Sequence, residues 1–436
     1  MNDIPSFNGY FEQSIKDNWL LDALTDYHGA TLQYHDVARK VEKMHIMMEA
    51  AGIKKGDRIA LCGRNSAHWA VAFIATLTYG AVIVPILHEF NGEQIHNIVN
   101  HSESRLLFVG DYVVNIINPD EMPKLEGIFN LPDFSLHTSR NEKLTDARER
   151  LNELFGVKYP NAFRRDDIHW HKDDPEELCM INYTSGTTGF SKGVMLPYRA
   201  LWGNVDFCQK RLGIHMPRFS RVLSILPMAH MYGMSMEFLF SFCSGYHLYF
   251  LTRLPSPAII AEAFKEICPD VVIAVPLIIE KIIRKRVFPK IQNNAMKLML
   301  QMPVVKDKVK QRICKEVYDA FGGKAYEVIA GGAPLNQEVE KFLKDIGFPI
   351  TVGYGTTECA PLISYSDHFH FIPSSCGQPV SHMEVKILSS NPQYIEGDGR
   401  LVAEVSGTRR LLSYQGETER DEEKPRCLYR AFHQTY

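Results

Sequence analysis

Two kinds of segment alternate along this chain. Short apolar runs, rich in β-branched residues, predict strands at 58–62, 81–85, 106–109, 178–183, 222–226, 247–251, 271–275 and 326–330. Between several of them, stretches such as 36–51 and 257–267 carry apolar residues at helical spacing and predict amphipathic helices. Because strands that alternate with helices usually form parallel sheets covered by helices, the pattern predicts an α/β fold with right-handed crossovers.

The pattern changes after residue 353. Helical periodicity fades there, and 377–388 resembles strands of a separate, smaller β region. We therefore expect a core over 1–397, with layered β/α subdomains to about residue 352 and the smaller β region over 353–397. In the remainder, 398–436, eight of the ten residues 417–426 are charged, which predicts a disordered tail.

Two long apolar stretches raise the question of a membrane span. No Lys, Arg, Asp or Glu lies between Arg64 and Glu89, and 69–87 is almost wholly apolar. Gly80 and Pro85 interrupt this run, so it predicts a buried helix followed by a short strand rather than a span. We interpret the run 225–245, which contains Glu237, in the same way. The first residues lack a basic, apolar leader, so we expect no secretory signal.

Composition and charge narrow the setting. Of the 436 residues, 45% are hydrophobic and 23% charged, which is globular, and a net charge of -3 gives no reason to expect a nucleic-acid partner. Nine cysteines without a Cys-x-x-Cys pair predict reduced thiols in the cytoplasm. The histidine pairs His169 and His171, His368 and His370, and His96 and His101 lack a third ligand at suitable spacing, so we expect no structural metal site.

One local charge departs from this average. Residues 281–312 carry ten Lys and Arg against one acid, Asp307. A solvated helix face is the first interpretation. The alternative is an amphipathic contact over 277–312 with anionic lipid, at the inner face of the membrane, or with coenzyme A phosphates. Its apolar members are Leu277, Ile278, Ile282 and Ile283, beside the basic residues Arg284, Lys285 and Arg286.

The segment that follows the apolar run at 178–182 is dense in Gly and hydroxyl residues. It reads Tyr-Thr-Ser-Gly-Thr-Thr-Gly-Phe-Ser-Lys-Gly from Tyr183 to Gly193. Glycines allow backbone N–H groups to approach a polyphosphate, hydroxyls add donors, and Lys192 supplies a cation. Ser191 stands where a Walker A loop has Gly, and no Ser or Thr follows Lys192. The pattern therefore predicts a phosphate loop of another kind, with a flexible turn as the alternative.

This loop closely resembles the phosphate loop of the adenylate-forming acyl-activating enzymes, a superfamily that includes acyl-CoA synthetases, luciferases and peptide-synthetase adenylation domains. Three further segments occur in that family's order: Leu-Pro-Met-Ala-His-Met-Tyr-Gly at 226–233, Gly-Gly-Ala-Pro-Leu at 331–335 and Gly-Tyr-Gly-Thr-Thr-Glu at 353–358. The likeness covers about residues 20–400 and is nearest to the bacterial long-chain fatty acid–CoA ligases.

The resemblance implies roles for individual residues. The catalytic group is His230, Thr357, Glu358 and Lys192, with Glu358 also a ligand of Mg²⁺. The nucleotide-binding residues are Thr184, Ser185, Gly186, Thr187, Thr188 and Gly189 of the loop, Gly331, Gly332, Ala333 and Pro334, and Tyr354, Gly355 and Thr356. The residue types at 353–358 agree with these implied roles, because a Tyr ring can stack on adenine, a hydroxyl can bind phosphate and a carboxylate is a hard ligand for Mg²⁺.

His230 has two interpretations. A lone His in an apolar run is usually a satisfied core residue. The resemblance instead puts it where the acyl tunnel meets the α-phosphate, so we expect it to position the carboxylate rather than to transfer a proton. Its neighbours Met228, Met231, Met234 and Met236 suit an adaptable apolar pocket, although Met at this spacing is also typical of plain core.

Taken together, the resemblance implies an ATP-dependent ligase that activates a medium- or long-chain fatty acid as acyl-adenylate and transfers it to coenzyme A. Two alternatives stay open: a non-catalytic protein that binds ATP or acyl-adenylate, and an enzyme that delivers the acyl group to a carrier-protein thiol.

The last part of the chain departs from the family pattern. The expected Tyr-x-x-Gly-Asp, hinge and small C-terminal domain with an adenylation Lys are not found. Asp398 lies in Gly-Asp-Gly without the Tyr, and Lys424 lies in a charge run. From this we expect a chain shortened by truncation or by a reading-frame shift near Thr408.

Overall fold

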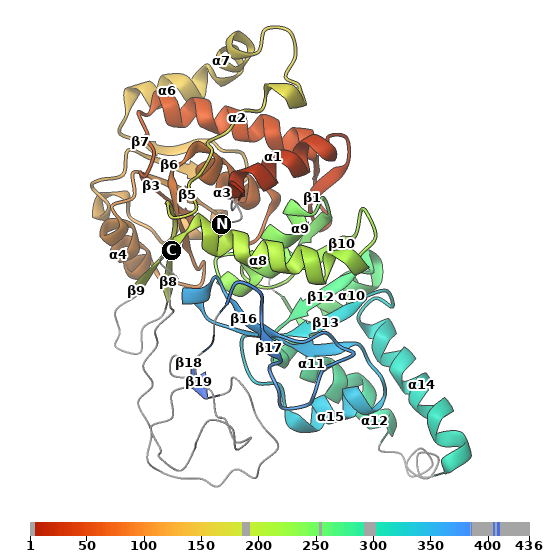
Figure 1. The fold of residues 1–436 in the computed structure, drawn as a ribbon. Coiled ribbons are helices and arrows are strands. Elements are labelled where there is room, and N and C mark those ends of the chain that lie inside the picture. Colours follow the sequence, from red (N-terminus) through yellow and green to blue (C-terminus); the bar gives the residue numbers. More distant parts are fainter. Residues whose placement is uncertain are drawn as a thin grey trace. The chain divides into compact units, whose positions relative to one another are not determined.

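The computed structural model describes residues 5–184, 192–252, 255–291, 302–383, 385, 404–405 and 408–409. The chain divides into two compact units, an N-terminal unit (Met1–Leu254) and a C-terminal unit (Pro255–Tyr436). Each is considered by itself below, and Figure 1 labels their elements.

The N-terminal unit contains most of the predicted alternation of strands and helices. Its strands are β1 (Asp22–Asp26), β2 (Thr31–Gln33), β3 (Arg58–Cys62), β4 (Val82–Ile86), β5 (Leu106–Val109), β6 (Gly127–Asn130), β7 (Leu136–Ser139), β8 (Leu178–Thr184), β9 (Lys192–Pro197), β10 (Arg221–Ser224) and β11 (His247–Phe250). Its α-helices are α1 (Phe7–Asp17), α2 (Tyr34–Ala50), α3 (Ala67–Tyr79), α4 (Gly92–Ser102), α5 (Asp111–Val114), α6 (Glu142–Glu149), α7 (Leu151–Lys158), α8 (Tyr198–Arg211) and α9 (Phe240–Cys243). Its 3-10 helices are η1 (Pro119–Glu121), η2 (Arg165–Asp167) and η3 (Gly213–His215), and η4 (Gly233–Leu239) is a π-helix.

Seven strands of this unit form one sheet in the order β7-β6-β5-β3-β4-β8-β9. The strands from β6 to β8 run parallel, whereas β7 and β9 pair antiparallel at the two edges. On one face Val82 and Val84 of β4 pack with Ile95 and Ile98 of α4. Ile83, on the opposite face, is equally buried. Burial on both faces explains why these strands are continuous apolar runs instead of alternating ones.

A second group of strands in the same unit pairs in the order β10-β11-β1-β2. The pairs β10–β11 and β11–β1 are parallel, and β1–β2 is antiparallel. The helix α2 packs against α3, α6 and α7, and Figure 1 shows it beneath α6 and α7.

The C-terminal unit contains a short parallel sheet and a small antiparallel one. Its elements are α10 (Pro257–Ile267), β12 (Val271–Ala274), α11 (Pro276–Ile282), the π-helix η5 (Ile283–Val287), α12 (Phe288–Ile291), α14 (Pro303–Ala320), β13 (Glu327–Ala330), α15 (Gln337–Asp345), β14 (Ile350–Val352), β15 (Tyr354–Gly355), η6 (Thr357–Cys359), β16 (Leu362–Tyr365), β17 (Gln378–Pro379), β18 (Glu404–Val405) and β19 (Thr408–Arg409). β14, β13 and β12 pair in parallel, and β15, β16 and β17 pair antiparallel.

The strand and helix predictions are largely confirmed. All eight predicted strands form, with ends that differ by at most two residues, and the expected α/β fold class is correct. α3 begins and ends as the sequence indicates: Ser66 Oγ accepts the N–H of Trp69, and Gly80 adopts φ +86° at the C-cap. The strands β1, β2, β6, β7, β9 and β14 were not predicted, because they are short or partly polar, whereas β15, β16 and β17 lie in the smaller β region expected over 353–397.

One other expectation changes. Within 377–388, only Gln378–Pro379 forms a strand among the described residues, while the following residues turn. Among the described residues, no helix has both the length and the apolar character needed to cross a membrane. The predicted tail, 398–436, lies outside the described residues apart from the two-residue strands β18 and β19.

Candidate functional site

The Gly- and hydroxyl-rich segment closes a β-hairpin at the edge of the larger N-terminal sheet. β8 and β9 pair antiparallel, and their last paired residues are Thr184 and Lys192. Thr184 is half-buried and Lys192 is exposed. Ser185, Gly186, Thr187, Thr188 and Gly189 lie outside the described residues. The structure therefore brings the two ends of the predicted phosphate loop together, as a phosphate-binding hairpin needs.

Tyr183 fixes the base of this hairpin. Its hydroxyl lies 2.6 Å from Nδ1 of His101 on α4. Its ring also lies beside its cross-strand partner Gly193, where a Cβ would meet Ile181 Cγ2 at 2.8 Å and Tyr183 Cζ at 3.2 Å. A side chain at 193 would therefore require the Ile181 and Tyr183 side chains or the hairpin itself to shift.

The His230 segment is a turn, not a strand or a helix. It follows β10 and leads into the π-helix η4. His230 N–H donates to Pro227 O over 3.0 Å, and Met234 N–H donates to His230 O over 2.9 Å. Gly233 begins η4 directly against the turn, since a Cβ there would lie 2.7 Å from Pro227 O. π-Helical turns inside helices are frequent at functional sites.

Three buried polar side chains hold the backbone of this turn. Asn65 donates from Nδ2 to Leu226 O over 2.6 Å and accepts the N–H of Met228 at 2.9 Å. Glu237 accepts the N–H groups of Ile225 and Leu226 at 3.2–3.3 Å. Asn182 of β8 donates from Nδ2 to Ala229 O over 2.9 Å.

The last of these bonds connects two of the predicted motifs. Asn182 lies two residues before Thr184, on the strand that enters the predicted phosphate loop, and Ala229 precedes His230. Both residues are at least 94% buried, so the bond is shielded from water. The hairpin and the His230 turn are thereby held together within the N-terminal unit.

The His230 side chain is exposed, unlike the rest of the turn. Partial desolvation by the surrounding protein lowers the pKa of the imidazole, against the opposing charge of Glu89. Nδ1 accepts the N–H of Tyr232 at 3.3 Å. With Nδ1 as acceptor, the neutral ring carries its proton on Nε2. His230 is therefore equipped to donate a hydrogen bond outward near neutral pH.

In the C-terminal unit the other two motifs lie side by side. β13 and β14 are parallel neighbours, with Ala330 opposite Val352, so Gly331 and Gly353 follow the carboxyl ends of adjacent strands. Gly353 N–H donates to Ala330 O over 2.9 Å, and Gly331 N–H donates to Ala274 O over 3.2 Å. Ligands of open α/β sheets bind at this edge.

The first of these two segments is exposed and open. Gly332, with φ +79°, Ala333 and Pro334 are all exposed, whereas Leu335 is buried. Asn336 then caps α15, accepting the N–H groups of Glu338 and Val339 at its side chain. The turn between β13 and α15 therefore exposes backbone atoms and no large side chains.

The second segment is a strand followed by a tight turn. Tyr354 pairs with Ser364 of β16, and Gly355 pairs with Leu362. A Cβ on Gly355 would lie 2.1 Å from Pro361 O, so only glycine fits. Thr356 N–H donates to Pro361 O over 2.8 Å. Tyr354, Thr356 and Thr357 are half-buried.

Glu358 is the candidate metal ligand. It is exposed within the turn η6, and among the described residues it forms no salt bridge. No group of three or more His, Cys, Asp or Glu within the described ranges could hold a metal ion. A single open carboxylate suits Mg²⁺, which is usually held by one or two carboxylates and the phosphates of the substrate.

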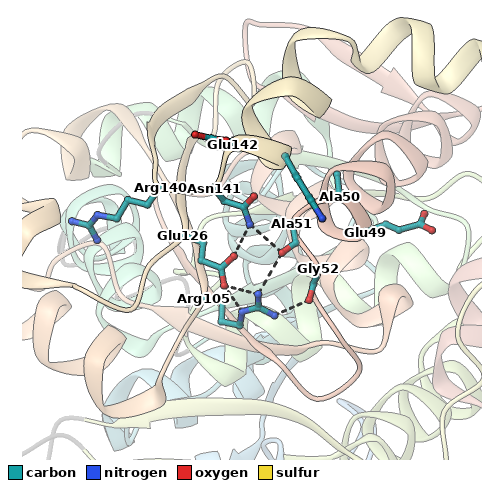
Figure 2. Close-up of a pocket in the computed structure, with 10 residues that line it drawn as sticks. Glu49, Ala50, Ala51, Gly52, Arg105, Glu126, Arg140, Asn141 and Glu142 are labelled. Atoms are coloured by element: carbon teal, nitrogen blue, oxygen red, sulfur yellow. Dashed lines mark hydrogen bonds and ion pairs between the residues drawn. The ribbon is translucent and has the colours of Figure 1, made fainter.

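The cavity that Figure 2 draws is elsewhere in the N-terminal unit and contains none of the predicted site residues. Its volume is about 600 Å³, and it is lined where α2 ends and α6 begins. The Arg105 guanidinium crosses its floor, donating to Gly52 O over 2.9 Å and to Glu126 Oε1 over 2.7 Å. Asn141 also donates to Glu126, over 2.8 Å. These groups are satisfied by each other, so the cavity is a structural junction.

Sequence reasoning missed Asn65, Asn182 and Glu237. All three lie in segments interpreted from the sequence as apolar runs, and none of them was assigned a functional role. The available signal is their polarity: a buried amide or carboxylate in an apolar run must find partners, and here the partner is an irregular turn.

Comparison of the chain with known protein families identifies its family. The chain belongs to the AMP-binding enzyme family, whose model matches residues 11–407. This confirms the resemblance to adenylate-forming acyl-activating enzymes that the four motifs carry.

Curated relatives are distant and longer. Long chain acyl-CoA synthetase 2 of Arabidopsis thaliana is 24% identical over 387 residues, which cover 81% of this chain and 56% of that protein. The human long-chain-fatty-acid–CoA ligase ACSBG2 is 24% identical over 381 residues, covering 82% and 56%. The chain thus spans little more than half the length of these relatives.

Solved structures share the fold. The inhibitor-bound N-terminal domain of FACL13 from Mycobacterium tuberculosis has a TM-score of 0.66 at 20% identity, covering 88% of this chain and 85% of that one. The anthranilate CoA ligase AuaEII in complex with anthranoyl-AMP gives 0.65 at 16% identity, covering 88% and 65%. These similarities establish the helix-covered sheet architecture.

Proposed function

We propose that this protein is an ATP-dependent acid–thiol ligase that activates a medium- or long-chain fatty acid as its acyl-adenylate and passes the acyl group to coenzyme A. The observation that carries the proposal is the Asn182–Ala229 bond, which joins the strand entering the Gly- and hydroxyl-rich loop to the His230 turn. A turn bearing one exposed His beside a phosphate-type hairpin is the arrangement that adenylation of a carboxylate needs.

The hairpin would bind the triphosphate. A carboxylate is a poor nucleophile toward a polyanion, so donors and cations must offset charge around the α-phosphorus. Lys192 supplies the cation and Thr184 a hydroxyl at the hairpin ends. Ser185, Gly186, Thr187, Thr188 and Gly189 are proposed to supply further hydroxyl and backbone donors.

His230 would position the substrate carboxylate. A neutral ring with its proton on Nε2 donates a hydrogen bond to a carboxylate or to an oxygen of the adenylate. Its lowered pKa keeps it neutral at physiological pH, so the proposed role is orientation without proton transfer.

The two motifs of the C-terminal unit would hold the nucleotide. Gly331, Gly332, Ala333 and Pro334 are proposed to border adenine, where their small side chains permit close approach. Tyr354 would stack on the base beside Gly355 and Thr356, and Thr357 would bind the α-phosphate. Glu358 would hold Mg²⁺, which neutralises phosphate charge when bound.

The substrate class rests on the relatives and on the apolar surroundings of the turn. Two curated relatives are named as long-chain acyl-CoA synthetase and ligase. Met228, Met231, Met234 and Met236 are buried around the His230 turn. Flexible thioether side chains adapt to apolar ligands of different length.

An ATP–pyrophosphate exchange assay with an acid panel tests the proposal. Exchange that depends on a fatty acid supports adenylation, and thioester formation with coenzyme A supports the acceptor. Acid-dependent exchange with transfer only to a phosphopantetheinyl carrier protein would redirect the proposal to that acceptor. Nucleotide binding without exchange for any acid would contradict catalysis and favour a binding protein.

We also propose that the basic segment contacts anionic membrane surfaces peripherally, on the cytoplasmic side. Lys281, Arg284 and Lys285 are exposed, which supports an electrostatic contact. Of its apolar neighbours, Ile282 and Ile283 are buried within the C-terminal unit and Leu277 is 59% exposed. The proposed contact is therefore mainly electrostatic and sensitive to salt.

A further inference from the structure

We infer that Asn65 and Glu237 are positioning residues for the reaction, acting through His230 by fixing the backbone of residues 224–229. The inference rests on the proposed function, because it assigns a task to the same turn. Neither residue belongs to the four motifs that carry the family resemblance.

Asn65 uses its whole side-chain amide on this turn. Nδ2 donates to Leu226 O over 2.6 Å and to Ser224 Oγ over 3.0 Å, and Oδ1 accepts the N–H of Met228 at 2.9 Å. Two donors and one acceptor are thus matched at fixed angles. A carboxylate lacks the donors and an apolar side chain lacks all three, so few residue types could replace it.

Glu237 follows the turn in the sequence, whereas Asn65 precedes it, and Glu237 also bonds to the backbone of the turn. It lies in the π-helix η4, entirely buried, and receives hydrogen bonds from Ser224 Oγ at 2.8 Å and from the N–H groups of Ile225 and Leu226. Ser224 connects the two residues, because it accepts from Asn65 and donates to Glu237. Desolvation by burial raises the pKa of the Glu237 carboxyl group to about 8, against the opposing effect of these hydrogen bonds.

These two residues account for backbone groups that the local structure leaves open. After β10 ends at Ser224, the N–H groups of Ile225 and Leu226 donate to the Glu237 side chain, and the N–H of Met228 donates to Asn65 Oδ1. Pro227 contributes no N–H at all. The path of the turn that carries His230 is therefore held by Asn65 and Glu237, together with the Asn182 bond to Ala229 O.

The reason to assign positioning and not only stability is the contrast within the turn. Residues 224–226 and 228 are buried and fully engaged, whereas His230 is exposed with its Nε2 directed away from its backbone bond at Nδ1. A rigid support beneath one exposed, pre-oriented group is what precise placement of a reacting carboxylate demands, since small misplacements cost large factors in rate.

A double-mutant cycle in the full chain tests this. We expect Asn65→Ala to lower the kcat of acid-dependent ATP–pyrophosphate exchange about tenfold or more while the KM for ATP changes less than about twofold. In a His230→Ala background the same change should cost less than about twofold more, because the residue acts through the missing ring. Fully multiplicative losses would overturn the inference. Glu237→Gln provides the second variant should Asn65→Ala not fold.

Asn8→Ala is the matched control. Asn8 is also buried in the N-terminal unit, and its side-chain amide donates to Leu77 O and His171 O over 3.1 Å, outside the turn of residues 224–230. We expect it to lower Tm to a similar extent but to leave kcat unchanged. An equal loss of kcat in this control would mean that general destabilisation explains the Asn65 effect.

A measurement independent of catalysis separates this inference from the proposed function. In histidine NMR, the His230 signal is identified by its absence in His230→Ala. Asn65→Ala and Glu237→Gln should shift its titration midpoint, and Asn8→Ala should not. If the wild-type chain shows no exchange, the proposed function is wrong. The NMR result still tests whether Asn65 and Glu237 position His230. An unchanged His230 signal would contradict it.

Discussion

Asn182 donates its side-chain amide to the carbonyl of Ala229 over 2.9 Å, from a strand to a turn that lies 47 residues further along the chain. We expect Asn182→Leu, similar in volume, to leave that buried carbonyl unpaired and to cost about 1–3 kcal/mol of stability. Exchange activity should fall as well, because the hairpin and the His230 turn lose their connection. Urea unfolding and exchange kinetics measure both effects.

Asn100→Leu is the comparison for this prediction. Its amide also donates to a carbonyl, Glu121 O, but at the surface. We expect little change in either quantity there, and an equal loss in both variants would mean that the Asn182 bond has no special role.

A substitution at Gly193 tests how tightly the hairpin of β8 and β9 is packed. Gly193→Ala places a Cβ 2.8 Å from Ile181 Cγ2 and 3.2 Å from Tyr183 Cζ, so the hairpin must shift. We expect a raised KM for ATP together with a loss of about 1–3 kcal/mol of stability. Gly156→Ala in α7, where nothing lies within 4 Å, should instead stabilise the protein by about 0.5–1 kcal/mol. Equal behaviour of the two variants would contradict the packing argument.

A substitution at Glu358 tests whether this residue is a ligand of Mg²⁺. Glu358→Gln keeps the shape of the side chain and removes its charge, so we expect the Mg²⁺ concentration for half-maximal exchange to rise about tenfold while folding is unaffected. Glu262→Gln, another exposed carboxylate of the C-terminal unit, should leave the Mg²⁺ titration unchanged. A normal titration in Glu358→Gln would remove this residue from the site.

Three histidines of the N-terminal unit predict acid sensitivity. Desolvation by burial lowers the pKa of His45, His68 and His247 to about 4. Because the unfolded chain then takes up protons first, their contribution to stability is complete above about pH 6.5 and is lost progressively as the pH falls toward about 4. We expect Tm to decline over this interval.

A variant isolates one of these contributions. His247→Gln can retain a hydrogen bond to Thr25 Oγ1, which now lies 2.7 Å from Nε2. It should make the decline of Tm with acid shallower, whereas His137→Gln at the exposed surface should not. An unaltered pH profile in His247→Gln would show that this residue does not couple protonation to folding.

The basic segment predicts salt-sensitive binding to vesicles. Reversing Arg284, Lys285 and Arg286 to Glu should weaken sedimentation with vesicles rich in anionic lipid at low salt, because each basic residue near such a surface contributes about 1 kcal/mol. Reversal of three exposed lysines of the N-terminal unit, Lys54, Lys143 and Lys172, controls for the net charge. Equal binding by both triple variants would contradict a specific contact.

Much of the fold was accessible from pattern alone. The strand β3 and the helix α10 form over the predicted residues because their apolar spacing and end signals agree. The edge strand β9 was not predicted. It pairs with only one neighbouring strand and is partly exposed along most of its length, so its hydrophobic pattern is weak. The basic segment shows the reverse: its apolar residues Ile282 and Ile283 were expected beside the charges, and tertiary packing buries them.

By itself, the sequence determined the alternation of strands and helices, the four motifs and the family, because these depend on residue type and spacing within short segments. Only the tertiary structure decided which motifs lie together, through the register of β13 with β14 and through the Asn182–Ala229 bond. It also decided that Asn65 and Glu237 support His230. The physical reason is that buried polar side chains must find partners, and partners distant in sequence are chosen by packing and not by local pattern.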